Sequence, residues 1–329
     1  MLSSMDVFDR YHPQNLTMIF RSDDDGKNWY YVCDIMPCFW GKLFLHKGEV
    51  YLLGCSTQHG DLLIGKSPDG GMSFDAPVVL LRGSNGKQGH DGWHKNPQPL
   101  LRHNGRLYET LEWGSSISGW HKDRYDYAAM VMSCDENSDL LVPENWSFTA
   151  PVMFDPSWAP ELCHLPHNTR TLEGCMVVDP DGRLLNIMRF ENTEQKAIVY
   201  EVDQTNHEAP LKYLRCMDFP ANRTKFEIKF DPVSRRYYTI GTRIYAEDRQ
   251  NARNLSSLLV SEDLVHWRVA WDVFDYRHSD YEKVGFQYVD FEFEGDDMIF
   301  LCRVSLNDAH NLHDTNYQTF HKLKQFRQL

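Results

Sequence analysis

An eight-residue pattern that occurs twice constrains the fold of this chain more than any other feature. The stretch SDDDGKNW begins at Ser22 and the stretch SPDGGMSF begins at Ser67, so both read S-x-D-x-G-x-x-aromatic. The Asp carboxylate can accept hydrogen bonds from N–H groups inside such a turn, and the Gly adopts positive φ without steric cost. Ser22 and Ser67 are 45 residues apart. A tight turn repeated at this spacing indicates a β-propeller with one blade per repeat.

Turn signals between strand-like runs recur along the rest of the chain. A propeller blade is four antiparallel strands with the innermost first, so a turn such as D-G or N-G is expected to mark the first hairpin of each blade. Five such hairpins are predicted, at 42–53, 97–111, 174–189, 225–242 and 289–303. Degenerate copies of the repeated turn begin at Ser133, with an insertion, and at Ser261, without the Gly.

The N-terminal blade is anomalous because its first predicted strand, at 2–8, is a second strand of a blade, and the next, at 16–21, is a third. Either the C-terminal strand at 319–326 joins this blade, or an upstream strand precedes Met1, with or without a signal peptide. We therefore predict an all-β fold, a six-bladed β-propeller of the sialidase type forming a single domain over 1–329. Its first inner strand is missing or supplied by the C-terminal blade.

Several stretches resemble a bacterial family of sialidase-like proteins, or exo-α-sialidases, in which the repeated turn is the Asp-box or BNR repeat. They are LEG at 172–174, FP at 219–220 with TKF at 224–226, GFQY at 285–288 with Asp290, and AHN at 309–311 through NY at 316–317. The resemblance implies a carbohydrate-active propeller, with glycoside hydrolases and polysaccharide lyases in the wider fold. The F-R-I-P stretch of true sialidases is absent, which argues against sialic acid as the substrate.

The composition of the chain argues against some classes of binding partner. The net charge of −13 argues against a general nucleic-acid binder, and no apolar run is long enough for a membrane span. The 8 cysteines show no zinc spacing and several lie in apolar strand-like runs, so reduced cysteines are expected. No signal peptide is visible. The sequence as it stands predicts a cytoplasmic protein, or a periplasmic or secreted one if an N-terminal segment precedes it. The oligomeric state stays open.

The phase of the blades places the ligand face opposite the repeated turns. That face receives residues just before each inner strand and just after each second strand, and these positions converge on the axis. Arg189, Arg243 and Arg303 end the second strands of three successive blades. Converging guanidinium groups suit a substrate carboxylate, although each Arg can instead pair with a neighbouring Asp or Glu. The other predicted substrate-binding residues are Trp40, Glu112, Lys225, Gln287, His310 and His313.

Glu173 and Asp290 are the predicted catalytic pair, since glycoside hydrolysis typically uses one carboxyl as general acid and a second as base or nucleophile. Tyr288 is an alternative nucleophile, as a tyrosine is in sialidases. Because adjacent strand residues face opposite ways, Gln287 and Tyr288 are not expected to face the pocket together. His94 is a fourth catalytic candidate.

The leading hypothesis is a glycoside hydrolase of an acidic or modified terminal sugar, with paired carboxylates in an axial pocket. One alternative is a uronate polysaccharide lyase using His and Tyr, and another is a non-catalytic glycan-binding propeller. The pairs His90/His94 and His310/His313 leave a metal site as a lesser alternative, but neither a metal nor a cofactor is expected.

Overall fold

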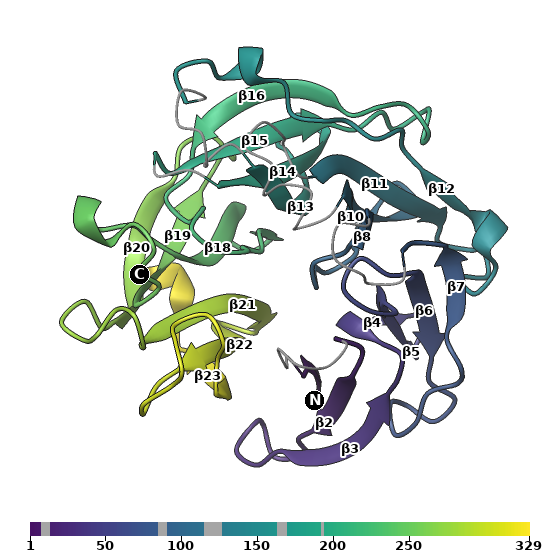
Figure 1. Ribbon diagram of the computed structural model, residues 1–329, viewed down its shortest axis with the longest axis horizontal. Coiled ribbons are helices and arrows are strands. Elements are labelled where there is room, and N and C mark those ends of the chain that lie inside the picture. The colour runs from purple at the N-terminus through teal and green to yellow at the C-terminus, as the bar shows by residue number, and fades with distance from the viewer. Residues whose placement is uncertain (8–13, 85–90, 115–126, 163–169, 192–193) are drawn as a thin grey trace. The chain divides into compact units, whose positions relative to one another are not determined.

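The computed structural model describes residues 1–7, 14–84, 91–114, 127–162, 170–191 and 194–329. Within this part the regular structure is β-strand, together with four 3-10 turns at Pro143–Asn145, Pro156–Trp158, Glu247–Arg249 and Phe326–Gln328. The strands form six antiparallel sheets in chain order (Figure 1). The predicted all-β, six-bladed β-propeller fold is thereby confirmed. No helix in the described ranges is long and apolar enough to cross a membrane.

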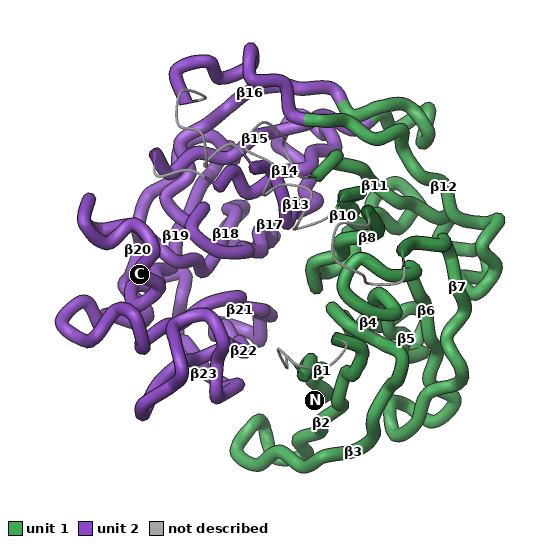
Figure 2. The backbone as a smooth tube through the Cα atoms, viewed as in Figure 1, with its two compact units in different colours: residues 1–153, 203–211 green, residues 154–202, 212–329 purple. Residues whose placement is uncertain are grey.

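The first compact unit comprises residues 1–153 and 203–211 and contains three sheets (Figure 2). The first sheet contains β1 (Leu2–Asp6), β2 (Thr17–Arg21) and β3 (Tyr30–Ile35). The second contains β4 (Phe39–His46), β5 (Glu49–Cys55), β6 (Leu62–Lys66) and β7 (Val78–Leu81). The third contains β8 (Gly92–His94), β9 (Leu101–His103), β10 (Arg106–Gly114), β11 (Tyr127–Asp135) and β12 (Trp146–Phe148).

The second compact unit comprises residues 154–202 and 212–329 and also contains three sheets (Figure 2). The fourth sheet contains β13 (Arg170–Val178), β14 (Leu184–Glu191), β15 (Lys196–Glu201) and β16 (Lys212–Asp218). The fifth contains β17 (Lys229–Asp231), β18 (Arg236–Thr242), β19 (Leu255–Ser261) and β20 (Arg268–Asp275). The sixth contains β21 (Gly285–Glu294), β22 (Asp297–Ser305) and β23 (Tyr317–Leu323).

All five predicted inner hairpins are present as antiparallel pairs, namely β4–β5, β9–β10, β13–β14, β17–β18 and β21–β22. The strand β5 is buried on both faces from Val50 to Cys55. Each unit has its own apolar clusters, one centred on Leu53 and Ile64 in the first unit and one on Ile187 and Val199 in the second. The described cysteines form no disulfide.

The first sheet begins, as predicted, with a strand that has no inner neighbour in the sheet. β1 pairs with β2, and β2 pairs with β3. The C-terminal strand β23 pairs with β22 and is the third member of the sixth sheet. In the described part of the chain, the C-terminal strand therefore does not supply the strand that the first sheet lacks.

The repeated turns form through their serine and aspartate side chains. Ser67 Oγ accepts a hydrogen bond from Gly71 N at 2.7 Å, and Asp69 Oδ1 accepts one from Ser73 N at 2.8 Å. The turn at Ser22 has the same pattern. The copy at Ser261 keeps the Ser and Asp contacts, with Leu264 at a φ of +62°. The side chains thus satisfy backbone donors that the turn leaves without a strand partner.

We expect Ser67→Ala to lower the free energy of unfolding by about 1–2 kcal/mol, because it leaves the buried Gly71 N–H without an acceptor. Urea denaturation measures this change. The matched control is Ser138→Ala, since the Ser138 hydroxyl makes no hydrogen bond to the described residues, and its effect is expected to stay below about 0.5 kcal/mol. Equal losses in both variants would contradict this account of the turn.

Candidate functional site

Two bulged inner strands position the central side chains of the second unit. The pairing of β13 with β14 shifts register between Leu172 and Cys175, and that of β21 with β22 shifts between Gln287 and Asp290. Glu173 and Tyr288 stand within these shifts at φ of +52° and +55°. A non-glycine residue is strained in this region, and a bulge re-aims its side chain. Such strain is concentrated at functional sites.

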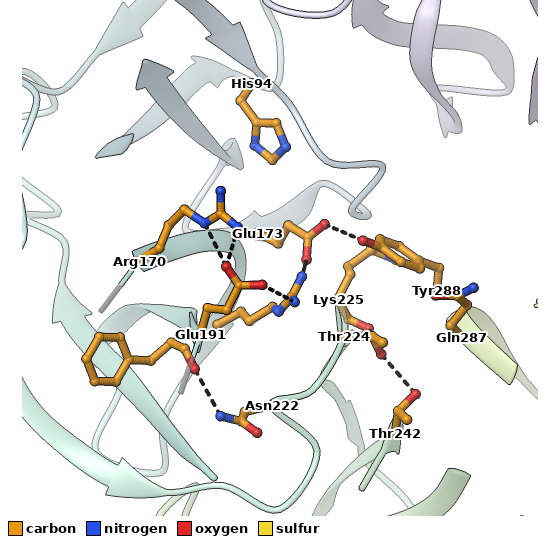
Figure 3. Close-up of polar contacts among 12 residues, drawn as sticks. His94, Arg170, Glu173, Glu191, Asn222, Thr224, Lys225, Thr242, Gln287 and Tyr288 are labelled. Carbon is orange, nitrogen blue, oxygen red and sulfur yellow. Dashed lines mark hydrogen bonds and ion pairs between the residues drawn. The ribbon is translucent and has the colours of Figure 1, made fainter. Parts of the chain in front are cut away.

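The two re-aimed side chains contact each other. The Tyr288 hydroxyl donates a hydrogen bond to Glu173 Oε1 at 2.9 Å (Figure 3). Glu173 Oε2 accepts from Arg189 Nη1 at 2.5 Å. Glu173 and Arg189 are buried, with 5% and 3% exposed. Both carboxylate oxygens of Glu173 are therefore engaged, one by a cation and one by a phenol.

Arg189 also connects Glu173 to a second carboxylate. Arg189 Nη2 donates to Glu191 Oε1 at 3.2 Å, and Arg170 Nε donates to Glu191 Oε2 at 2.7 Å (Figure 3). Burial alone would raise the pKa of the Glu191 carboxyl, but Arg189 and Arg170 outweigh it and lower this pKa to about 2. Glu191 is thus a fixed negative charge that orients Arg189.

Two further arginines surround the Tyr288 ring. The guanidinium carbon of Arg303 lies 4.7 Å from the ring centroid and that of Arg253 lies 6.0 Å from it. Arg253 Nη1 donates to the Gln287 side-chain oxygen, and Gln287 Nε2 donates to the Leu312 carbonyl at 2.7 Å. Gln287 and Tyr288 therefore face the same arginine. The bulge interrupts the regular alternation of the strand at these two residues, and the expectation that they do not face the pocket together stays a prediction.

Burial raises the pKa of Tyr288, and the charge of Glu173 raises it further, against the opposing effect of Arg189, Arg253 and Arg303. At neutral pH the phenol is therefore protonated, with its hydrogen directed at Glu173. The arrangement can transfer this proton to the carboxylate when the phenol oxygen forms a bond to a substrate carbon. The nearby guanidinium groups stabilise the negative charge that develops on the oxygen.

Asp290 and Arg243 lie in other surroundings. Asp290 is one of the charges that raise the pKa of Lys229, whose ion pairs are with Glu227 and Glu292. The residue in contact with Glu173 is Tyr288, and the catalytic pair Glu173/Asp290 stays a prediction without geometric support. Arg243 Nη1 forms an ion pair with Asp272 at 2.9 Å, which is the pairing with a neighbour that the sequence left open.

The remaining predicted residues of the second unit are Lys225, His313 and His310. Lys225 is buried, with 1% exposed, and Figure 3 shows it beside the Glu173–Tyr288 pair. The carbonyl of His313 accepts from Arg303 Nη2 at 2.9 Å, while its ring contacts Asp314. Burial and Arg253 lower the pKa of His313, so its ring is neutral at pH 7. His310 is exposed to solvent.

His94, Glu112 and Trp40 form a cluster in the first unit. His94 Nδ1 contacts the buried Glu112 carboxylate, and β8 pairs His94 opposite Glu112 on β10. The His94 ring lies 4.6 Å from Trp40 and 4.8 Å from Tyr127, centroid to centroid. Trp40 has a φ of +55° at a register shift in β4. A carboxylate at Nδ1 orients the imidazole so that Nε2 is its second proton-transfer atom.

Sequence reasoning missed three arginines of the second unit: Arg170, Arg223 and Arg253. Arg170 begins β13, and Arg223 lies in the stretch between the FP and TKF motifs. Arg253 stands eleven residues after the second strand β18 and directly before the third strand β19. Extending the search to the whole loop between second and third strands would have found it. Among the described residues no group of three or more His, Cys, Asp or Glu side chains is arranged to hold a metal ion, and His90 lies outside them.

No protein-family model matches the chain, and no curated protein matches it in sequence. Its fold is similar to an α-L-arabinofuranosidase from Fusarium graminearum in complex with an iminosugar inhibitor, with a TM-score of 0.58, 12% identity and coverage of 98% of this chain and 89% of the other. It is also similar to the Penicillium chrysogenum α-L-arabinanase complexed with arabinobiose, with a TM-score of 0.55, 13% identity and coverage of 96% and 86%.

A third similar structure is an ulvan lyase bound to -[GlcA(1-4)Rha3S]-, with a TM-score of 0.53, 12% identity and coverage of 94% of this chain and 70% of the other. At these identities, all three similarities concern the fold.

We expect Glu173→Gln to lower the pKa of Tyr288, because it removes the carboxylate charge that disfavours the phenolate. Chemical shifts of tyrosine labelled at Cζ, followed against pH and assigned with Tyr288→Phe, measure this pKa. Asp290→Asn is the matched control and is expected to leave it unchanged. A larger shift in Asp290→Asn than in Glu173→Gln would show that Asp290 is the carboxylate next to Tyr288.

The lowered pKa of Glu191 implies that this residue stabilises the fold in a pH-dependent way. A carboxyl whose folded-state pKa is lowered to about 2 stabilises the fold above its ordinary pKa, and this contribution is lost as pH falls. We therefore expect Glu191→Gln to be less stable than the parent at pH 7, with the difference narrowing as pH falls from about 5 towards 2. Urea midpoints across this range measure the difference. A constant difference would contradict the ion pairing of Glu191.

Proposed function

We propose that the protein is a glycosidase that removes an acidic terminal sugar, with Tyr288 as nucleophile and Glu173 as the base that accepts its proton. The observation that carries the proposal is the 2.9 Å hydrogen bond from the Tyr288 hydroxyl to a buried carboxylate. A nucleophile whose proton is held by an adjacent base is the usual arrangement for covalent catalysis. In this proposal Tyr288, rather than Asp290, is the catalytic partner of Glu173.

The first chemical step forms a bond between the Tyr288 oxygen and the anomeric carbon while the bond from that carbon to the leaving-group oxygen breaks. The Tyr288 proton passes to Glu173 Oε1, and the leaving oxygen takes a proton from a general acid or from water. Water then attacks the anomeric carbon and the bond to the Tyr288 oxygen breaks. The phenolate takes back the proton held by Glu173, and the proton of the attacking water passes to the group that protonated the leaving oxygen, or to solvent. A tyrosine nucleophile suits an anionic sugar, because a neutral phenol is repelled less by the sugar carboxylate than a carboxylate nucleophile is.

The arginines favour a negatively charged substrate. Arg253 and Arg303 lie at the Tyr288 ring, where a sugar bonded to the phenol oxygen would lie. Guanidinium groups bind carboxylates through paired, charge-assisted hydrogen bonds. The solved structures with a similar fold include an arabinofuranosidase, an arabinanase and a lyase, so carbohydrate chemistry is common in this fold. Fold similarity alone leaves the substrate open.

A second candidate function, elimination from a uronate, is favoured by the His94–Glu112 contact in the first unit. In that reaction His94 Nε2 removes the proton α to the uronate carboxylate, the bond to the leaving oxygen breaks, and a carbon–carbon double bond forms. Tyr127, whose ring lies 4.8 Å from that of His94, is a donor for the leaving oxygen. Growth of near-ultraviolet absorbance from an unsaturated uronate identifies this reaction.

A panel of 4-methylumbelliferyl glycosides, neutral and acidic, tests the leading proposal, because their activated leaving group reduces the need for a general acid. We expect release of fluorophore from an acidic member and a loss of kcat of at least about 10²-fold in Tyr288→Phe. Tyr276→Phe, which changes an exposed phenol in the same unit, is the control and is expected to retain activity.

The same assays separate the alternatives. Absorbance growth on uronate polysaccharides that is lost in His94→Ala and kept in Tyr288→Phe would replace the hydrolase with the lyase. The control for that variant is His278→Ala, at an exposed position. Binding of an acidic glycan with neither fluorophore release nor absorbance growth would indicate a non-catalytic glycan-binding propeller.

A further inference from the structure

The arginine cluster of the second unit contains more positive charge than its carboxylates balance. Its two carboxylates, Glu173 and Glu191, pair with Arg189 and Arg170. Four more cations belong to the cluster: Arg223, Arg253, Arg303 and Lys225. Among the described residues, no carboxylate forms an ion pair with any of these four. The ion pairs therefore leave a surplus of positive charge around Tyr288.

Neutral groups are the hydrogen-bond partners of the surplus arginines. Arg223 Nη2 donates to Asn251 Oδ1 at 2.7 Å, Arg253 donates to Gln287, and Arg303 donates to the His313 carbonyl. The Nε groups of Arg223 and Arg253 are buried without a partner among the described residues, and Lys225 is buried, with 1% exposed. Buried donors of this kind require an acceptor, and an uncompensated buried charge requires a counter-charge.

Burial and repulsion between the arginines lower the pKa values of two of them. Burial, together with the charges of Arg189 and Arg253, lowers the pKa of Arg223 to about 10. Burial and the charges of Arg189 and Arg303 also lower the pKa of Arg253, against the opposing Tyr288. A single substrate carboxylate would neutralise only part of this charge.

We propose that this cluster has two anion subsites, one at Arg253 and Arg303 beside Tyr288 and one at Arg223 and Lys225. Resting on the proposed function, the inference assigns the substrate as a doubly anionic sugar. Its carboxylate occupies the first subsite, and a second carboxylate or a sulfate or phosphate ester occupies the second. Each of these candidates for the second subsite presents negatively charged oxygens, in a planar carboxylate or a tetrahedral ester.

The second subsite stands on a segment that the structure holds firmly. Asn222 Nδ2 donates to the carbonyls of Phe190 and Lys196, at 2.9 and 3.1 Å. Thr224 Oγ1 donates to Thr242 Oγ1 at 3.0 Å. These anchors flank Arg223 and immediately precede Lys225. Cations on a fixed backbone lose little conformational entropy on binding an anion, which is the condition for a specific subsite.

Selenate tests the proposal without reference to catalysis, because it is a tetrahedral dianion that anomalous diffraction locates. We expect crystals soaked in selenate to show two anions, one within hydrogen-bond distance of Arg253 or Arg303 and one within that distance of Arg223 or Lys225. Arg223→Met is expected to lose the second anion and keep the first. Arg236→Met, which removes a partly exposed arginine paired with Glu262, is the control and is expected to keep both.

One selenate or none in the parent protein would overturn the proposal, as would two selenates in the Arg223→Met crystals. Sulfate titration followed by thermal unfolding gives the solution counterpart, with at least about a tenfold weaker apparent affinity expected in the combined Arg223→Met, Lys225→Met variant. Unchanged affinity would contradict the second subsite. Because anion occupancy does not require turnover, failure of the proposed hydrolysis would leave this result standing, and failure here would leave the Tyr288 chemistry to its own test.

Discussion

The buried ion pair between Glu173 and Arg189 is the interaction on which the rest of the second unit's site depends. Both side chains are almost wholly buried, where a charge without a partner is strongly destabilising. Glu173 reaches Arg189 from a strained backbone conformation at a bulge. The same conformation presents its other oxygen to Tyr288. The ion pair with Arg189 and the hydrogen bond from Tyr288 thus offset the strained backbone and the burial of the Glu173 charge. Removing either Glu173 or Arg189 would leave the other charge without this partner in the interior.

This ion pair also explains why Tyr288 remains a protonated phenol beside so many cations. Arginines favour the phenolate, whereas burial and the fixed charge of Glu173 favour the phenol, and the balance is a raised pKa. The phenol can therefore stay protonated until its oxygen bonds to carbon. At that moment, in the proposed reaction, Glu173 accepts the proton and the arginines at the ring stabilise the negative charge on the oxygen. Glu191 acts through Arg189, because it accepts a hydrogen bond from Arg189 Nη2 and so orients that guanidinium.

The fold was predictable because turn chemistry is local. Ser67, Asp69 and the glycines around them satisfy one another within a few residues, and the same is true of the inner hairpin turns. The rim rule that follows from these turns also found Glu173, Arg189, Arg303 and Tyr288. It found His94 with Glu112 as well, which meet across one strand pair.

The partners within the site were not predictable from the sequence. The strand β21 is bulged between Gln287 and Asp290, and the sequence around Tyr288 carries no simple signal for that bulge. Arg253 comes from the far end of a long loop, and its approach to Tyr288 depends on the packing of the fifth and sixth sheets. Asp290, which the sequence favoured as a carboxylate near Glu173, follows the bulge in β21, and its charge contributes to the raised pKa of Lys229.

Trapping a covalent intermediate tests most directly whether the Tyr288 oxygen, activated by Glu173, bonds to the sugar, as we propose. Fluorinated glycosyl fluorides of acidic sugars slow the release of a glycosyl-enzyme, so the adduct can be mapped by proteolysis and mass spectrometry. We expect one adduct per chain, on the peptide that contains Tyr288, and none in Tyr288→Phe. An adduct on Glu173, or rapid turnover of the parent glycoside through an adduct on any other residue, would contradict the proposal.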